Sequence, residues 1–213
     1  MTGPEVSVEA ITVNGKTEIV AITDKEIIGN GNFTEIGHRQ PSTLPMAIQH
    51  EIRDVVCRTV AAIGIDHSPS HTELKVTPTG VKVVEIGARL GGDNITTHLV
   101  PLSTGVDLVE ICLDISVGNP VTQYSACPNT SAIRYFQPDC GVITEISGVE
   151  EARQLACVKE ICLLRGVGDQ VPSITSSTDR IGFVIAQGCG EHTAEEICSQ
   201  AVNQINIKVR SKS

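Results

Sequence analysis

The sequence of 213 residues has almost no aromatic side chains, with no Trp, two Tyr and three Phe. Hydrophobic residues nevertheless make up 40% of it, so a core has to be assembled from Ile, Val, Leu and Ala. Such a composition is typical of an α/β core. The length suffices for one large domain or two small ones.

The sequence also lacks an excess of basic residues. Lys and Arg number 16 against 25 Asp and Glu, which gives a formal net charge of −9 at pH 7. A surface of this charge repels a phosphate backbone, so we expect no nucleic-acid partner. Any basic groups that meet a phosphate must be few and local.

Long apolar runs are missing as well. No run approaches the roughly 20 residues that a membrane-spanning helix needs. The first residues, MTGPEVSVEA, have neither the basic start nor the apolar stretch of a signal peptide. We therefore expect no membrane association and a cytoplasmic location.

Paired cysteine motifs are absent too: the sequence has eight Cys but no CxxC pair. Cys57, Cys112 and Cys198 fall at apolar positions of helical patterns. We therefore interpret the cysteines as buried, reduced thiols rather than as disulfides or zinc ligands.

Two hairpins are predicted in the first half of the chain. Asn14-Gly15 is a strong two-residue hairpin turn, and a second turn is expected over residues 77–80. The strands on either side alternate apolar and polar side chains. The expected strands are residues 5–13, 16–23, 71–76 and 81–86.

Two helices are predicted around the second hairpin. The first covers residues 44–63, and the second lies beyond Asp93 and ends at Gly118. We interpret the polar stretch 28–42 as a loop. The expected apolar positions are Ile48, Ile52, Val55, Val56, Val60 and Ile63 in the first helix, and Val106, Leu108, Val109, Cys112 and Leu113 in the second.

A change in composition near residues 121–130 divides the chain. We expect domains at 1–124 and 125–213, the second being a small β/α unit. Ser147-x-x-Glu150 and Thr193-x-x-Glu196 are capping boxes that predict helix starts. The expected strands of this unit are residues 131–136, 140–146, 158–164 and 180–186.

Two carboxylates stand out in the second hairpin. Glu73 and Glu85 are each in the middle of a predicted strand, with the turn near their midpoint. In an antiparallel hairpin this symmetry brings them close to opposite positions. Facing carboxylates repel each other, and a bound Mg²⁺ removes the conflict. The alternative is a pair of exposed glutamates on a solvated face, and the hairpin alone does not decide between the two.

The residues that follow favour a ligand site. Gly91 and Gly92 allow backbone amides to approach a ligand closely, and the helical segment beyond them offers its positive end to an anion. Arg89 adds a permanent charge with a forked donor geometry. A glycine-rich turn with a surface Arg is the alternative.

These motifs resemble a known family. Residues 71–75 (HTELK) and 85–93 (EIGARLGGD) look like the C-terminal metal-site motif of ATP-grasp enzymes. Residues 3–9 are similar to the strand after the adenine-binding hinge, and the likeness continues through 101–108 and 132–136. The chain is most similar to ligases that join a carboxylate to an amine, especially L-amino-acid (dipeptide) ligases.

The resemblance implies an α+β fold. An antiparallel sheet with helices would form the C-terminal ATP-grasp subdomain, and a small β/α C-terminal domain would follow it. It further implies ATP and Mg²⁺ as cofactors, with Mn²⁺ as an alternative. The implied roles are metal and nucleotide binding by Glu73 and Glu85, adenine contact by Leu74, catalysis by Arg89 and Gly92, and substrate binding by Gly91 and Gly92. His38 falls on a polar loop and is expected either to bind the amino-acid substrate or to be a surface histidine.

One residue departs from the family pattern. Many relatives have a metal-contacting Asn two positions after the second Glu, where this chain has Gly87. Other candidates have equally plausible structural roles: Arg134 is expected to pair with an acidic neighbour, and His50 and His67 to be structural or exposed. Glu5, Ser7 and Glu9 share one strand face and are expected either to border the nucleotide or to be solvated.

The resemblance also implies partners. Carboxylate and amine small molecules are the expected substrates, and a homodimer is compatible with the family. We interpret the chain as a C-terminal part that needs a missing N-terminal ATP-grasp half and expect no ATP turnover from it alone. The alternatives are a protein like biotin carboxylase or carbamoyl-phosphate synthase, which activates bicarbonate, and a non-catalytic assembly module.

Overall fold

The computed structural model describes residues 1–27, 35–121 and 129–211. The chain forms two compact units, Met1–Lys25 with Gln40–Asn129, and Glu26–Arg39 with Thr130–Ser213. The predicted boundary between residues 124 and 125 lies outside the described residues and stays a prediction. Segment Glu26–Arg39 contributes to the second unit, although the sequence pattern placed it in the first domain.

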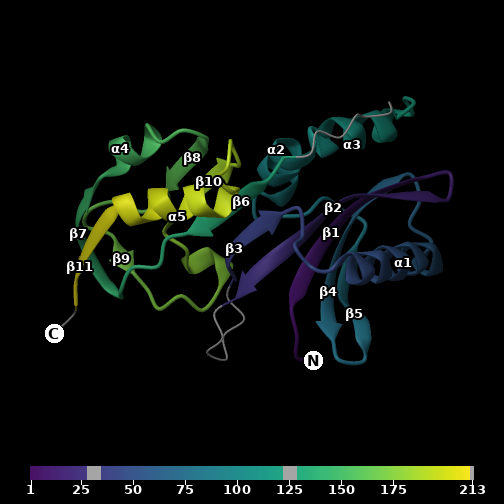
Figure 1. Cartoon of the computed structure of the whole chain (residues 1–213), viewed down its shortest axis with the longest axis horizontal. Coiled ribbons are helices and arrows are strands. Elements are labelled where there is room, and N and C mark those ends of the chain that lie inside the picture. Colours follow the sequence, from purple (N-terminus) through teal and green to yellow (C-terminus); the bar gives the residue numbers. More distant parts are fainter. Residues whose placement is uncertain (28–34, 122–128, 212–213) are drawn as a thin grey trace. The chain divides into compact units, whose positions relative to one another are not determined.

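The first unit contains an antiparallel sheet in which both predicted hairpins are present (Figure 1). The central strands β1 and β4 pair directly, in the order β5-β4-β1-β2. The strands are β1 (Glu5–Val13), β2 (Lys16–Ile27), β4 (Ser68–Thr77) and β5 (Gly80–Gly87).

Helix α1 (Met46–Ile63) covers one face of this sheet. Its residues Ile52, Val56 and Val60 are fully buried, as predicted. Ile63 was expected on the same face but is 58% exposed, because the helix ends there and Gly64 turns the chain with a left-handed backbone, φ 79°. Core partners from the strands are Val6, Val8, Ile22, Leu74 and Val81.

The segment after β5 continues through a π-helical turn, Ile95–Leu99, and helix α2 (Val100–Thr104) to helix α3 (Leu108–Val117). The predicted end of α3 at Gly118 is confirmed. Its predicted apolar side is partly wrong. Leu108 and Ile111 are buried, whereas Val109 and Leu113 are exposed, since apolar residues occur on more than one side of this helix and leave the buried side ambiguous.

The strands of the second unit lie in a larger and a smaller sheet. Helix α5 (Ala194–Gln204) packs against β6 and β10 of the larger sheet (Figure 1). In the larger sheet these strands follow the order β3 (Glu35–Gln40), β6 (Ser131–Tyr135), β10 (Gly182–Gln187) and β8 (Val158–Leu163), and in the smaller one the order β11 (Asn206–Arg210), β7 (Gly141–Ser147) and β9 (Gln170–Val171).

The two predicted capping boxes have different outcomes. The Thr193–Glu196 box is confirmed, because the Thr193 hydroxyl accepts from the Glu196 amide and the Glu196 carboxylate accepts from the Thr193 amide. The Ser147–Glu150 box is wrong. Helix α4 (Val149–Arg153) begins after Gly148, whose φ of 82° lets the chain turn without a side-chain cap.

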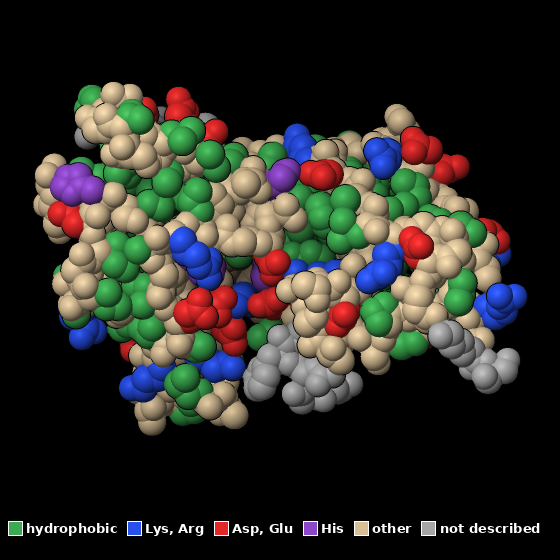
Figure 2. Space-filling view, turned by 180° about the vertical axis from the view of Figure 1, so that it is seen from behind, with side chains coloured by type: hydrophobic (Ala, Val, Ile, Leu, Met, Phe, Trp, Pro, Cys, Tyr) green, Lys and Arg blue, Asp and Glu red, His purple; other side chains and the backbone are tan. Residues whose placement is uncertain are grey.

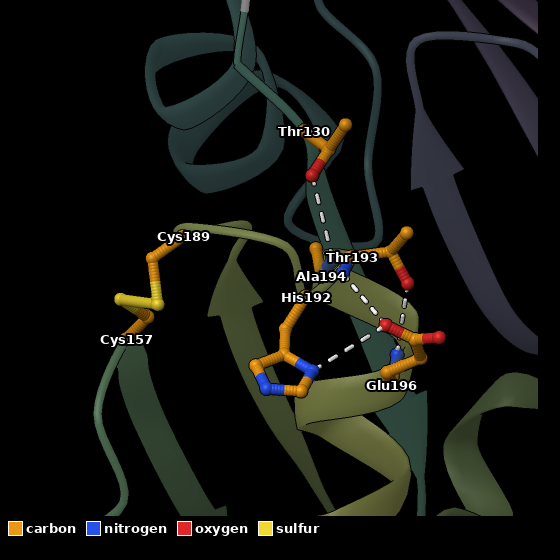
Figure 3. The surroundings of a disulfide bond; sticks show 7 residues. All are labelled: Thr130, Cys157, Cys189, His192, Thr193, Ala194 and Glu196. Atoms are coloured by element: carbon orange, nitrogen blue, oxygen red, sulfur yellow. Dashed lines mark hydrogen bonds and ion pairs between the residues drawn. A yellow bond between two sulfur atoms is a disulfide. The ribbon is translucent and has the colours of Figure 1, made fainter.

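The expectation that all cysteines are reduced is also wrong. Cys157 and Cys189 form a disulfide, with their Cα atoms 6.4 Å apart (Figure 3). It joins the start of β8 to the loop before α5. Thirty-two residues separate the two in sequence, so only the tertiary fold brings them together. Cys57, Cys112 and Cys198 are free thiols, and burial raises the pKa of Cys198 to about 12.

The expectation of a loop over residues 28–42 is wrong for part of that stretch, and residues 28–34 lie outside the described residues. Residues Glu35–Gln40 form strand β3, and His38, expected on a polar loop, has no exposed surface. Hydrogen bonding to a neighbouring strand organises this segment, and its sequence contains no clear alternation to predict that.

Within the described residues, no helix is long and apolar enough to cross a membrane. On the face drawn in Figure 2, acidic and basic side chains are interspersed over the surface.

Candidate metal and phosphate site

Glu73 and Glu85 are Cα partners across the β4–β5 hairpin. A bulge in β5 produces this register. Thr77 pairs with Gly80 and Leu74 with Val83, whereas the next residue of β4, Glu73, pairs with Glu85. A regular ladder would set Glu73 opposite Val84 instead. The extra residue therefore brings the two carboxylates together.

The face of the sheet that carries Glu73 is polar but largely closed to solvent. Strand β1 pairs with β4 so that Ser7 lies opposite Glu73 and Glu9 opposite His71. Ser7, Glu9 and His71 are each less than 5% exposed. The alternative in which this face of β1 is exposed to solvent is therefore wrong. Its buried polar groups need hydrogen-bonding partners.

Lys25 provides one such partner. Its ammonium group, 4% exposed, lies 3.1 Å from Oε1 of Glu5 and 2.7 Å from Oε1 of Glu73. Lys75 approaches the other oxygen of Glu5 at 3.1 Å. Two lysines and two glutamates thus alternate across β1, β2 and β4, and their charges offset one another.

His71 links two further carboxylates. Its Nδ1 lies 2.6 Å from Oε1 of Glu9, and its Nε2 lies 3.5 Å from Oε1 of Glu73. Burial opposes charge on His71, but its contacts with Glu73 and Glu9 outweigh burial and raise the pKa of His71 to about 9. The contact with His71, acting against burial and together with Lys25, lowers the pKa of Glu73 to about 2. Near neutral pH the imidazole is charged and Glu73 is ionised.

Arg89 lies beside the second carboxylate. Its Nη2 donates to Oε1 of Glu85 at 3.1 Å and its Nη1 to the carbonyl of Leu90 at 3.1 Å. A side chain at Gly87 would contact Arg89, since an added Cβ would be 3.1 Å from Cγ and 3.2 Å from Nε. The small residue at position 87 thus leaves room for Arg89 to reach Glu85. The half-exposed guanidinium remains accessible.

The two glycines of the loop have different surroundings. A Cβ on Gly91 would lie 2.7 Å from both Glu9 Oε1 and His71 Nδ1, so its backbone packs directly on that pair. Gly92 is exposed and has open space where a side chain would be. Asp93 and Asn94 follow with φ angles of 52° and 60°, a left-handed conformation that is unusual outside glycine and clusters at functional sites.

Leu74 is not on this face. It is fully buried in the core that packs on α1, because neighbouring residues of a strand point to opposite sides. Its placement does not support the expected contact with adenine, and we assign it a core role.

His38 belongs to a buried group in the second unit. Its ring meets Tyr135 edge-on, with 6.0 Å between the ring centroids. Arg180 lies over the same Tyr135 ring and contacts Glu35 at 2.8 Å. Arg134 pairs with Glu26 at 2.7 Å, in line with the acidic pairing expected for it. His50 and His67 are exposed.

The donor set around Glu73 and Glu85 suits a hard divalent cation. Carboxylate oxygens are the ligands that Mg²⁺ and Mn²⁺ prefer. In the described part of the chain, the ion pairs of Glu73 and of Glu85 all use Oε1. The Oε2 atoms are therefore the donors that fit a cation, while Lys25 and Arg89 offset the remaining charge.

Two family models match parts of the chain. Residues 1–97 match the family model of the ATP-grasp domain. Residues 134–210 match that of L-amino acid ligase C-terminal domain 2. The resemblance to ATP-grasp enzymes that the sequence indicated is thereby confirmed, and so are both expected parts of the α+β fold.

Three similar proteins illustrate the relationship. The chain is 30% identical to the uncharacterized protein y4rH of Sinorhizobium fredii over 218 residues, 98% of this chain and 45% of that protein. It is 31% identical to the L-arginine-specific L-amino acid ligase of Bacillus subtilis over 131 residues, 60% of this chain and 31% of that enzyme. Its fold matches an L-amino acid ligase structure from Bacillus licheniformis with a TM-score of 0.86 at 23% identity, covering 98% of this chain and 52% of that one. The chain thus spans about half the length of these proteins or less.

Sequence reasoning proposed the two glutamates, Arg89 and the glycines of this candidate site, but it missed Lys25 and the link between His71 and Glu9. Lys25 is far from Glu73 in sequence, and only the pairing of β1 with β2 and β4 brings the two together. The alternation of polar residues in β1, namely Glu5, Ser7 and Glu9, was the sequence signal that could have indicated these contacts.

Proposed function

We propose that this chain provides the metal- and phosphate-binding part of the active site of an ATP-dependent ligase. The ligase would join the carboxylate of one amino acid to the amine of another through an acyl phosphate. The pairing of Glu73 with Glu85, followed by Arg89 and Gly91-Gly92, carries the proposal. The match to L-amino acid ligase C-terminal domain 2 supports the substrate class.

In this reaction the substrate carboxylate attacks the γ-phosphorus of ATP, and ADP leaves with the electrons of the broken P–O bond. The amine then attacks the acyl carbon, phosphate leaves, and the amine loses a proton. Mg²⁺ or Mn²⁺ bound here supplies positive charge that offsets the charge of the phosphates.

The chain's own residues have separate roles in the proposal. Glu73 and Glu85 would hold the cation. Arg89, which is half-exposed, stabilises negative charge on the transferring phosphoryl group and the acyl phosphate. Gly92, with open space above its backbone, lends an amide to the acyl phosphate. Gly91 borders the amino-acid substrate, whereas His38, which has no exposed surface, is assigned no contact with it.

Turnover is proposed for the complete ATP-grasp enzyme. The relatives that match this chain extend well beyond it, and ATP-grasp enzymes enclose the nucleotide between two subdomains. We therefore propose that the 213-residue chain needs the other ATP-grasp half for catalysis. Amino-acid-dependent ATP hydrolysis by the chain alone would overturn this part of the proposal.

The test is amino-acid-dependent release of phosphate by the complete enzyme, measured across pairs of amino acids. Glu85→Gln keeps the shape of the side chain but removes its charge, so we expect activity to fall by about 100-fold or more. The matched control is Glu18→Gln, an exposed glutamate on a strand of the other hairpin, which should keep full activity. Near wild-type turnover of Glu85→Gln contradicts the metal role.

The same assay separates the alternatives. ADP formation that depends on bicarbonate and not on amino acids supports an enzyme like biotin carboxylase. Failure of the complete protein to bind Mn²⁺ and nucleotide at all supports a non-catalytic module.

A further inference from the structure

The buried pair of Glu9 and His71 lies between Glu73 and the loop that carries Gly91. Glu9 comes from β1 and His71 from β4, and they are directly opposite each other in the sheet. Their side chains are 1% and 5% exposed. The proposed chemistry does not use either one, yet a buried carboxylate beside an imidazole is costly unless the arrangement is well satisfied.

The contacts of His71 are directional. A carboxylate only accepts hydrogen bonds, so Nδ1 of His71 donates to Glu9 across 2.6 Å. This bond fixes the plane of the imidazole ring. The opposite ring atom, Nε2, then lies 3.5 Å from Oε1 of Glu73. The hydrogen bond to Glu9 therefore determines where Nε2 lies relative to Glu73.

Oε1 of Glu73 is therefore held from two directions, by Lys25 at 2.7 Å and by His71. Fixing one oxygen of a carboxylate limits rotation of the group and so determines where its second oxygen lies. A similar arrangement, in which a buried carboxylate orients a histidine, supports the ligands in many metal sites.

The same pair also supports the glycine loop. The backbone of Gly91 packs on both Glu9 and His71, with space for no side chain between them. The position of the loop that carries Arg89 and Gly92 is thereby tied to the groups that orient Glu73.

We propose that His71, oriented by Glu9, is a positioning residue that directs Oε2 of Glu73 toward a divalent cation and aligns the Gly91 loop with it. The inference rests on the proposed function of Glu73 as a metal ligand. His71 itself does not touch the cation or the substrate. Its loss acts through the geometry of Glu73.

The experiment measures binding of Mn²⁺ by electron paramagnetic resonance in the complete protein, with and without ADP. The variants are His71→Asn, Glu9→Gln, Glu73→Gln and Glu85→Gln. His50→Asn is the matched control, because His50 is exposed on α1. Thermal unfolding of every variant is recorded alongside, so that loss of stability is separated from loss of affinity.

We expect His71→Asn and Glu9→Gln to weaken Mn²⁺ binding by about 10- to 100-fold, whereas His50→Asn leaves it unchanged. A merely structural role predicts lower thermal stability with the Mn²⁺ affinity of the folded protein unaltered. Glu9→Gln preserves the size and shape of the side chain, so it provides the test if His71→Asn does not fold.

Two contrary results have different meanings. If Glu73→Gln and Glu85→Gln lose the Mn²⁺ site while His71→Asn and Glu9→Gln stay within twofold of wild type, the positioning role is overturned and the proposed metal site stands. If Glu73→Gln and Glu85→Gln bind Mn²⁺ as the wild type does, the proposed metal site fails and the positioning role fails with it.

Discussion

Glu73 and Glu85 lie opposite each other across one hairpin, yet each is paired with a different basic side chain. Glu73 contacts Lys25 at 2.7 Å, and Glu85 contacts Arg89 at 3.1 Å. The side chain of Glu73 is 25% exposed and that of Glu85 is 59% exposed. The two carboxylates can therefore be neighbours without a metal, because each already has a counter-charge, and the less exposed Glu73 has the shorter contact.

The first prediction concerns Lys25 and Glu73. Lys25→Met leaves Glu73 buried without its closest cation, so we expect the free energy of unfolding to fall by about 3 kcal/mol. The double variant Lys25→Met/Glu73→Gln should lose less than the sum of the single variants, with a coupling of about 1–3 kcal/mol. Chemical denaturation measures both quantities.

Lys208→Met is the control for that experiment. Lys208 also contacts a glutamate, Glu145 at 2.8 Å, but both side chains are about half exposed. Solvent screens such a pair, so little change in stability is expected. Strictly additive effects of the Lys25 and Glu73 substitutions would contradict the assigned ion pair.

The second prediction compares the two loop glycines. Gly91→Ala places a methyl group 2.7 Å from Glu9 and His71, and we expect it to destabilise the protein by about 1–3 kcal/mol. Gly92→Ala meets nothing within 4 Å and should leave the unfolding temperature unchanged. Calorimetry of the two variants checks this, and equal unfolding temperatures would contradict the packing of Gly91.

The third prediction is a pH dependence of stability. The pKa of His71 rises from 6.5 to about 9, so its contribution is complete below pH 6.5 and is lost as the pH rises through about 9. The pKa of Glu73 falls from 4.5 to about 2, so its contribution is present above pH 4.5 and is lost as the pH falls toward 2. The unfolding temperature should therefore be highest between pH 4.5 and 6.5.

Substitution of His71 tests the alkaline side of that dependence. In His71→Asn the decrease between pH 6.5 and about 9 should become shallower, because the group that loses its proton there is gone. Scanning calorimetry at several pH values measures it. A wild-type unfolding temperature that stays constant over this interval would show that His71 does not gain its proton affinity on folding.

The fourth prediction concerns the disulfide of the second unit. Reduction, or Cys157→Ser, releases a cross-link between residues 32 apart and should lower stability by about 2–4 kcal/mol. Cys140→Ser, which alters an exposed free thiol, is the control and should have no effect. If reductant leaves the unfolding temperature of the wild type unchanged, the cross-link does not stabilise the protein in solution.

Local patterns were sufficient to predict much of the fold. Asn14-Gly15 indicated the first hairpin, and the Thr193 capping box indicated α5. Strand β3 was missed because Glu35–Gln40 has no clear alternation and is ordered by its neighbours in the sheet. The wrong start of α4 has a similar cause, since the backbone of Gly148 turns the chain where the sequence suggested a serine cap.

The candidate site was predictable where its residues are close in sequence. Glu73, Glu85 and Arg89 lie within one hairpin and its following loop, so spacing alone placed them together. Lys25 and Glu9 approach Glu73 and His71 only through strand pairing, and no spacing rule covers such contacts. The burial of Leu74 likewise depends on which face of the sheet α1 covers.

The contact between Gly91 and the Glu9–His71 pair has a consequence for the length of the loop. Gly87 is still paired within the sheet, so the chain has four residues in which to move sideways by one or two strand spacings, about 5–10 Å. Four residues reach at most about 14 Å when fully extended. The segment therefore has about 4–9 Å of extended length to spare, and deleting one residue removes about 3.5 Å of it. Ala88 is exposed. Replacing it should alter the position of the loop far less than deleting it, because the residue contributes chain length rather than side-chain chemistry.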